Sequence, residues 1–207
     1  KPKLKQKYGD VFESSLNIKD EGILIELIEL IDSIPFTQID SDVKGDAFEY
    51  FLKNVTNGNK GLGEYYTPRH IIKMIIQLLN PVFGNKIYDS CCGTGGFLLE
   101  CYKYLAKNSD MTKQQVKDVI QKESIYGCEL TSTARISKMN MVLFGDGHSN
   151  IVQDNCLLQK NIKKEYFDIT VSNIPYSQNV DEGNFYKFPS KKGDSVFIQH
   201  LWESTKK

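Results

Sequence analysis

From residue 67 to the C-terminus, the hydrophobic positions alternate between strand-like runs and helix-like spacings. Short apolar runs bounded by turn residues predict strands at 86–90, 124–129, 151–154 and 167–172. Apolar residues three and four positions apart predict helices at 67–79, 96–107, 111–122 and 131–144. Because strands separated by helices form βαβ units, the sequence predicts an α/β fold around a mainly parallel sheet.

Signals at the helix ends agree with this pattern. Thr67-Pro68 is typical of an N-cap followed by proline at the first helical position, and Asn80-Pro81 is expected to end that helix. Thr131 is expected to cap the helix that runs to 144.

The first 60 residues have a helical pattern without strands. Apolar residues recur with a spacing close to 3.6 between Asp20, a potential N-cap, and Pro35, which stops the helix. A second helix is predicted at 43–55, and a glycine-rich linker follows at 57–63. We therefore expect an N-terminal helical lobe and linker at 1–60 and a second domain at 61–207.

The composition is that of a globular protein. Hydrophobic residues make up 40% of the chain and charged residues 25%. The apolar stretch 23–31 contains Glu26 and Glu29, and no signal peptide is visible, so we expect no membrane association. The formal net charge is zero, and a neutral segment is not expected to hold duplex DNA tightly by itself.

Cysteine and histidine residues predict no metal site. The five cysteines form no C-x-x-C pair, and the three histidines are scattered along the chain. An odd number of cysteines favours reduced thiols in a cytoplasmic protein over a disulfide framework.

A glycine turn after the first predicted strand suggests a ligand site. Gly93, Gly95 and Gly96 allow positive φ and let a ligand approach the backbone, and the helix that follows directs N–H groups toward it. Asp89, at the end of the strand, can accept hydrogen bonds from a ligand. The alternative is a tight turn without a ligand, since Leu98 stands where a third glycine of a dinucleotide motif would fall.

Two carboxylates follow the next strands. Glu129 can accept hydrogen bonds from both hydroxyls of a ribose, or it can favour the helix start near Thr131. Asp154 and Asn155 follow the third strand and could reach an adenine edge, although such residues are also common in turns.

The tetrapeptide Asn173-Ile174-Pro175-Tyr176 closes the fourth predicted strand. The Asn173 amide oxygen and the Ile174 carbonyl can both accept hydrogen bonds from one amino group, while Pro175 stiffens the loop. Tyr176 offers a stacking face for an extruded base. The alternative is a simple strand exit with an Asn turn.

These motifs together resemble the γ-type N6-adenine DNA methyltransferases, specifically the methylation subunits of type I restriction-modification systems. Residues 63–69 are similar to the family segment G-[EQ]-[FY]-[YF]-T-P-R, and residues 89–97 to its cofactor loop D-P-x-x-G-T-G-G-F. Glu129 matches the acidic ribose residue, and residues 173–176 match the motif N-P-P-[YF]. Ser90 and Ile174 depart from prolines of these motifs, but position 174 needs only a backbone carbonyl.

The resemblance implies a Rossmann-like methyltransferase domain that uses S-adenosylmethionine to methylate N6 of a flipped adenine in DNA. It implies catalytic roles for Asn173, Ile174, Pro175 and Tyr176. It implies cofactor contacts by Glu64, Tyr65, Tyr66, Thr67, Pro68, Arg69, Asp89, Gly93, Thr94, Gly95, Gly96, Glu129 and Asp154. As partners it implies DNA, a specificity subunit that reads the sequence, and a restriction nuclease subunit.

Other interpretations remain open at this point. One is a non-catalytic cofactor-binding assembly module, and another is a methyltransferase for RNA or protein glutamine; the glycine pattern disfavours a nicotinamide-dependent oxidoreductase. The family fold continues beyond the last motif, whereas this chain ends at Lys207 in what is expected to be the next helix. We therefore expect a domain that is truncated at its C-terminus, with reduced or absent activity in isolation.

Overall fold

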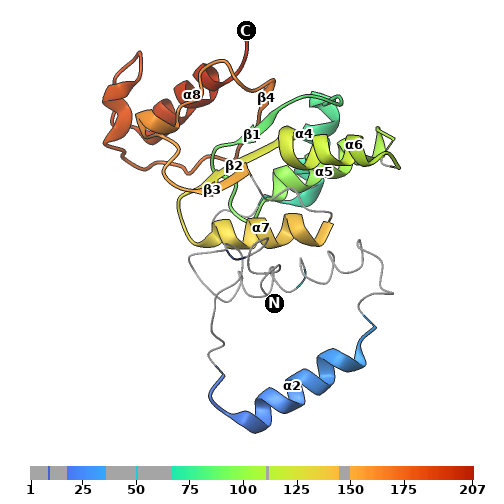
Figure 1. Ribbon diagram of the computed structural model, residues 1–207. Helices are drawn as coiled ribbons and strands as arrows, with labels where there is room; N and C mark the ends of the chain where they lie inside the picture. Colours follow the sequence, from blue (N-terminus) through green and yellow to red (C-terminus); the bar gives the residue numbers. More distant parts are fainter. Residues whose placement is uncertain (1–8, 10–17, 36–49, 51–66, 111, 145–149) are drawn as a thin grey trace.

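The computed structural model describes residues 9, 18–35, 50, 67–110, 112–144 and 150–207. A four-stranded parallel sheet lies at its centre, with the strand order β3-β2-β1-β4 (Figure 1). The strands are β1 (Ile87–Asp89), β2 (Ile125–Glu129), β3 (Ile151–Gln153) and β4 (Ile169–Thr170). The helices are α2 (Glu21–Ser33), α4 (Arg69–Leu79), α5 (Gly96–Lys107), α6 (Gln114–Val119), α7 (Thr133–Phe144) and α8 (Gly193–Ser204).

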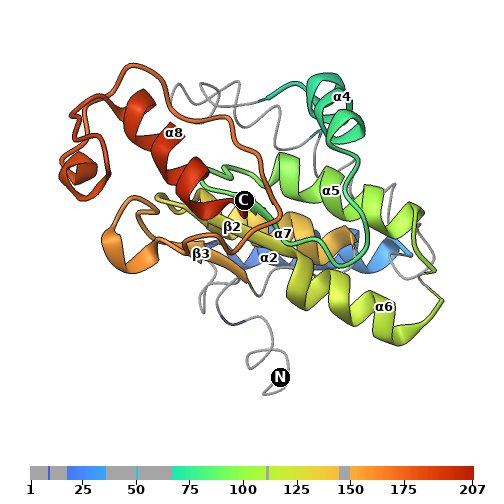
Figure 2. The same ribbon diagram turned by 90° about the horizontal axis from the view of Figure 1, so that it is seen from above.

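Helices cover both faces of the sheet. Side chains alternate along a strand, so Ile87 of β1 packs with α4, α5 and α7, whereas its neighbour Tyr88 packs with α8. Figure 2 shows α8 on one side of the sheet and α4, α5 and α6 on the other. The result is a three-layer arrangement, which confirms the predicted α/β fold with a parallel sheet.

The strand order reverses next to β1. The chain runs from β1 to β2 and β3 on one side, and then returns to place β4 on the other side of β1. In open α/β sheets, ligands bind outside the carboxyl ends of the strands at such a switch point. Residues that follow β1 and β4 are therefore brought together.

Most predicted elements agree with the structure to within a few residues. The predicted helix at 96–107 has the bounds of α5, and Asp20 caps α2 by accepting hydrogen bonds from the N–H groups of Gly22 and Ile23. Asn80 ends α4 in the left-handed conformation, as expected for a helix stop. Thr131 lies two residues before the first residue of α7, and its hydroxyl accepts a hydrogen bond from the N–H of that residue, Thr133.

Two predicted boundaries were wrong. The helix expected at 111–122 is α6 followed by a π-helical turn, Ile120–Ser124, which leads directly into β2. Thr67 does not cap α4: Pro68 occupies the N-cap position, and the Thr67 hydroxyl accepts a hydrogen bond from Asn173 instead. The hydroxyl oxygen of Thr67 therefore makes a tertiary hydrogen bond with Asn173, and it does not make a capping hydrogen bond within its own helix.

The C-terminal residues lie beside β4. The strand expected at 167–172 is regular only at 169–170, and Phe167 forms an isolated parallel bridge with Thr205. The chain does not end within a helix as expected, since α8 ends at Ser204 and Thr205 adopts an extended conformation. The hydroxyls of Thr170 and Thr205 lie 2.8 Å apart and tie this segment to β4.

Much of the predicted N-terminal lobe lies outside the described residues, including the linker at 57–63 and, apart from Tyr50, the helix at 43–55. Within the described lobe residues, α2 is confirmed as a helix, and none of its side chains is buried. Among the described residues, no helix is long and apolar enough to cross a membrane.

Candidate active site at the carboxyl edge of the sheet

A cavity of about 300 Å³ lies at the carboxyl ends of the four strands. Each strand contributes the loop that follows it, and α8 contributes one aromatic wall. The lining residues are Ser90, Cys91, Gly93, Thr94, Glu129, Leu130, Thr131, Thr133, Asp154, Asn155, Cys156, Asn173, Pro175, Gln178 and Phe197. The volume is at the lower end of the range for small-molecule sites, and the lining combines apolar walls with a few polar groups.

The glycine turn after β1 has the geometry that requires glycine. Gly93 and Gly95 have φ values of 51° and 85°, in the left-handed region. Gly96 does not have positive φ; a Cβ there would lie 3.0 Å from the guanidinium of Arg69 and from Ile72. The buried Asn140 of α7 stabilises the turn, because its side-chain amide donates a hydrogen bond to the Thr94 carbonyl at 2.8 Å.

Asp89 anchors the loop that it precedes. Its carboxyl group is buried and accepts hydrogen bonds from the Cys91 N–H at 3.1 Å and the Ser172 hydroxyl at 2.7 Å. Burial raises the pKa of Asp89 to about 7, although these two hydrogen bonds act in the opposite direction. Asp89 therefore connects the loop after β1 to the residue that precedes Asn173.

Glu129 joins the same turn from the end of β2. One carboxylate oxygen accepts a hydrogen bond from the Gly93 N–H at 3.1 Å, and the other accepts from the N–H and the hydroxyl of Thr131 at 2.9 and 2.7 Å. A carboxylate has about four acceptor positions, so one remains on the oxygen that faces Gly93. The contact with Thr131 is the alternative that the sequence left open, and Glu129 also lines the cavity.

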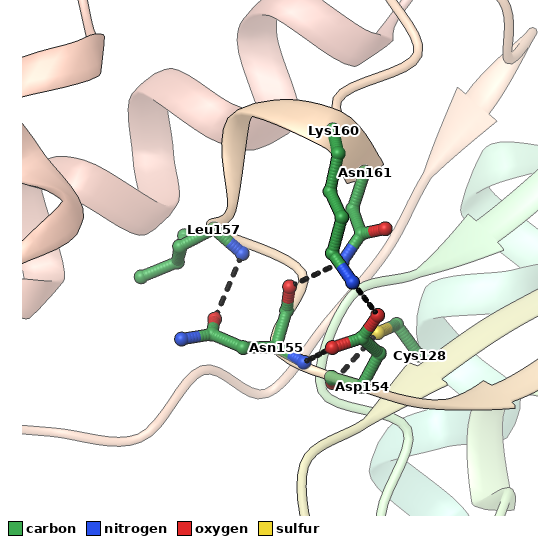
Figure 3. A network of polar contacts seen from close by, with 6 residues as sticks. All are labelled: Cys128, Asp154, Asn155, Leu157, Lys160 and Asn161. Atoms are coloured by element: carbon green, nitrogen blue, oxygen red, sulfur yellow. Dashed lines mark hydrogen bonds and ion pairs between the residues drawn. The ribbon is translucent and has the colours of Figure 1, made fainter.

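Asp154 lines the cavity and belongs to a polar network with five other residues (Figure 3). Its carboxylate accepts hydrogen bonds from the ammonium of Lys160 at 2.9 Å and the Asn155 N–H at 2.8 Å. The contact with Lys160 is the main reason that the pKa of Asp154 is lowered to about 2. The backbone carbonyl of Asp154 accepts from the Cys128 thiol, which fixes the loop against β2.

The polar groups of Asn155 are occupied by hydrogen bonds, mostly within the loop that follows β3. Its side-chain oxygen accepts from the Leu157 N–H at 2.9 Å, and its backbone carbonyl accepts from the Asn161 amide at 2.7 Å (Figure 3). Its amide nitrogen donates to Glu182. These contacts build the turn that the sequence offered as the alternative for this pair.

The side chain of Asn173 is held between two hydroxyl groups. Its amide nitrogen donates to the Thr67 hydroxyl at 3.1 Å, and its amide oxygen accepts from the Tyr176 hydroxyl. Asn173 and Pro175 line the cavity, whereas the side chain of Ile174 packs against the cluster under α8. The ring of Tyr176 is 68% exposed, so one of its faces is available to a planar ligand.

A smaller hollow of about 30 Å³ adjoins the cavity on the side of α4. Thr67, Arg69, Asp89 and Gly96 line it, together with residues that it shares with the main cavity, including Asn173. The Arg69 guanidinium donates to the Gly96 carbonyl at 3.0 Å and so joins α4 to the start of α5.

The structure thus brings together most of the predicted site residues that it describes. Gly93, Thr94, Glu129, Asp154 and Asn173 share the main cavity, and Thr67 reaches Asn173 from the adjoining hollow. Gly95 supports the turn, and Pro68 precedes α4 without lining either hollow. Glu64, Tyr65 and Tyr66 lie outside the described residues.

Sequence reasoning missed several groups in the walls of the cavity or behind them. Ser172 accepts a hydrogen bond from the Cys91 N–H at 3.2 Å and donates to Asp89, so it couples β1 to β4. Cys91, Cys156 and Phe197 line the cavity itself. The only sequence signal for Ser172 is its position next to Asn173, and the only signal for Cys91 is its position inside the glycine loop.

Comparison with known proteins finds one family along most of the chain. The family described as N-6 DNA Methylase matches residues 39–207. The type II restriction enzyme and methyltransferase RM.BcgI of Heyndrickxia coagulans is 33% identical over 156 residues, which are 72% of this chain and 24% of that protein. The type I restriction enzyme EcoEI methylase subunit of Escherichia coli is 27% identical over 208 residues, covering 97% and 41%.

A solved structure has the same fold. A chain from a type I R-M system, studied for its complex assembly and conformational transition, superposes with a TM-score of 0.79 at 24% identity. The similarity covers 98% of this chain and 42% of that chain. The chain therefore spans well under half the length of these relatives.

Proposed function

The chain belongs to the N-6 DNA methylase family, and from this premise we propose that it provides the methyl-transfer site of a type I modification subunit. The reaction would move a methyl group from S-adenosylmethionine to N6 of an adenine that is flipped out of DNA. The proposed partners are DNA, a specificity subunit that selects the target and a restriction nuclease subunit. Both similarity to type I methylase subunits and the arrangement of the cavity support this proposal.

The residues of the cavity fit S-adenosylmethionine. Nothing lies within 4 Å of the place where a Cβ of Gly93 would be, so the backbone of the turn is open to a ligand there, and the N-terminus of α5 lies directly behind the turn. The free acceptor position on Glu129 can take one ribose hydroxyl, and Asp154 lines the next part of the wall. Thr67, Arg69 and Asp89 line the adjoining hollow.

Asn173 and Ile174 are proposed to hold the amino group of the target adenine. The Asn173 oxygen has a second acceptor position besides the one that Tyr176 occupies, and the Ile174 backbone offers a carbonyl. The exposed ring of Tyr176 is placed to stack on the base, which is a common way to hold a flipped nucleotide.

The chemistry requires positioning more than acid–base catalysis. S-adenosylmethionine supplies an electrophilic methyl group. Two acceptors on the amino group draw electron density onto the nitrogen and align its lone pair, which is catalysis by orientation and electrostatics. The proposed step needs no general base, because the proton can leave to solvent after transfer.

The observation that carries the proposal is that Asn173, at the end of β4, lines the same cavity as the glycine turn and Glu129. A flat amine held at Asn173 would therefore face a ligand that rests on the glycine turn. The switch point between β1 and β4 creates this arrangement.

The experiment is methylation by the intact protein, expressed with its specificity subunit in cells that lack adenine methylation. N6-methyladenine in the genomic DNA is measured by mass spectrometry, for the wild type, Asn173→Ala and Asn184→Ala. Asn184 is exposed and lies outside the cavity lining, so this variant should methylate like the wild type. Asn173→Ala should lose most of the product; equal methylation by both variants would contradict the role of Asn173.

Binding tests the cofactor separately. Calorimetry with S-adenosylmethionine and with NAD should give binding of the methyl donor alone, weakened by Glu129→Ala. Binding of NAD alone would overturn the proposed function.

A further inference from the structure

Three cysteines lie in or directly behind the wall of the candidate active site, and the proposed methyl transfer uses none of them. Cys91 follows β1, Cys128 lies in β2 and Cys156 follows β3. All five cysteines of the chain are free thiols. Cys91 and Cys156 line the cavity, whereas Cys128 is buried behind it.

The three cysteines pack together. Cys128 and Cys156 belong to one buried cluster, and Cys91 packs against this cluster. The neighbouring thiols of Cys128 and Cys91, followed by burial, raise the pKa of the Cys156 thiol. Cys128 is already engaged, because its thiol donates to the Asp154 carbonyl at 3.1 Å. Of the three, Cys91 is the least buried and faces the cavity, so a reagent in the cavity reaches it first.

We infer that Cys91 and Cys156 are a modification site at which oxidation forms a disulfide, and that this disulfide and a ligand of the cavity exclude each other. The second half of the inference rests on the proposed function, which supplies the ligand. The oxidant is a small disulfide of the glutathione type. The site thus gives the candidate methyltransferase a thiol-dependent control.

The reaction balances as two thiol–disulfide exchanges. The Cys91 thiolate attacks the oxidant, forms a mixed disulfide and releases one thiol; Cys156 then attacks the Cys91 sulfur and releases the second thiol. Two protein thiols are oxidised and one small disulfide is reduced to two thiols. The raised pKa of Cys156 makes the second step the slower one at neutral pH.

The disulfide changes the cavity because of how Cys91 is anchored. Its backbone N–H is fixed on Asp89 and Ser172, and a sulfur–sulfur bond of about 2 Å is much shorter than a thiol contact. Closing the bond draws the loops after β1 and β3 together along one wall of the cavity. A ligand that needs the open wall therefore disfavours formation of the disulfide. By linkage, the disulfide lowers the affinity for that ligand by the same factor.

The test uses the intact protein, treated either with oxidised glutathione or with dithiothreitol. Peptide mapping without reduction should find Cys91 linked to Cys156, with Cys101 free as an internal control because it is buried in α5, away from the cavity. S-adenosylmethionine should bind at least about tenfold more weakly to the oxidised protein, and its presence should slow oxidation by a similar factor.

Variants distinguish the effect of the disulfide between Cys91 and Cys156 from the effect of oxidation elsewhere in the chain. Cys91→Ser should abolish the difference in affinity between the oxidised and reduced forms, whereas Cys101→Ser should retain it. Cys156→Ser should stop the reaction at the mixed disulfide on Cys91, which peptide mapping detects. In the wild type, a Cys128–Cys156 link, a mixed disulfide that stays on Cys91, or an oxidised protein with unchanged affinity would overturn the inference. If the reduced wild type binds no S-adenosylmethionine, the proposed function and the exclusion both fail, while the peptide map still decides whether the disulfide forms.

Discussion

The side-chain amide of Asn173 donates a hydrogen bond to the hydroxyl of Thr67 at 3.1 Å, across 106 positions of sequence. Thr67 precedes α4 on one side of the sheet, and Asn173 follows β4 at the switch point. This contact joins the segment that the family resemblance assigns to the cofactor with the residue that it assigns to the target base. We therefore propose that Thr67 is a positioning residue for Asn173.

Thr67→Val tests this role against a direct contact with the cofactor. Loss of one hydrogen bond to a part-buried amide should lower the single-turnover rate of methylation roughly fivefold to tenfold, with little change in the dissociation constant of S-adenosylmethionine. Thr67→Ser keeps the hydroxyl and should restore the rate. A weaker cofactor affinity at an unchanged rate would instead assign Thr67 to the cofactor.

The sequence predicted the framework of this site well. The α5 helix and the four strands follow from hydrophobic periodicity, and the left-handed Gly93 and Gly95 follow from the need for a tight turn. The parallel order of the strands then makes their carboxyl ends meet, which is a property of the fold class.

Two of the wrong predictions have a common physical cause, since each concerns a group that exchanged a local partner for a distant one. Thr67 bonds Asn173 in place of its own helix, and Thr205 pairs with Phe167 in place of extending α8. Such contacts depend on packing between segments far apart in the chain, so no local pattern reveals them. The thiol cluster was missed for the same reason, because Cys91, Cys128 and Cys156 come from three different strands or their loops.

Gly95 and Gly84 form a matched pair for testing the turn. Both have positive φ, 85° and 93°, but a Cβ at Gly95 would lie 2.5 Å from the Ser137 hydroxyl, whereas nothing lies within 4 Å of one at Gly84. Gly84→Ala should therefore lose about 1–2 kcal/mol of unfolding free energy from backbone strain alone. Gly95→Ala should lose more, about 3 kcal/mol, because overpacking is added.

Urea unfolding of the two variants measures this difference. Equal losses would show that Ser137 moves aside without penalty, and that the glycine at 95 is required only for its backbone conformation.

Asp89→Asn should remove a destabilising effect of high pH. Because burial raises the folded-state pKa of Asp89 from 3.8 to about 7, the folded protein binds its proton more tightly than the unfolded chain does. The stability that this group contributes is complete below pH 3.8 and is lost as the pH rises through 7. Asparagine still accepts the hydrogen bonds from Cys91 and Ser172, so the variant should gain stability over the wild type near pH 8 and little near pH 4.

Unfolding free energies from urea titrations at several pH values check this expectation. Asp89→Ala is the control for the hydrogen bonds, because it removes the charge and also both acceptor contacts, and it should be less stable than Asp89→Asn at every pH. A wild-type protein whose stability relative to Asp89→Asn is independent of pH would contradict the raised pKa.

His200 has the opposite dependence on pH. Its ring is fully buried between the hydroxyls of Tyr88, 3.1 Å from Nε2, and Tyr186, 3.2 Å from Nδ1. Burial lowers its pKa from 6.5 to about 4, so the unfolded chain binds the proton more readily. Its contribution to stability is complete above pH 6.5 and is lost as the pH falls through 4.

The windows of Asp89 and His200 overlap with opposite signs, so the two effects should largely cancel in the wild type between pH 4 and 6.5. His200→Gln removes the effect of His200 and leaves the effect of Asp89. Although the lost packing should lower its stability at every pH, the unfolding free energy of this variant should rise as the pH falls from 6.5 to 4, because Asp89 then acts alone. Asp89→Asn should show the reverse slope in the same window. Equal slopes in both variants would mean that neither buried group controls the acid response of the fold.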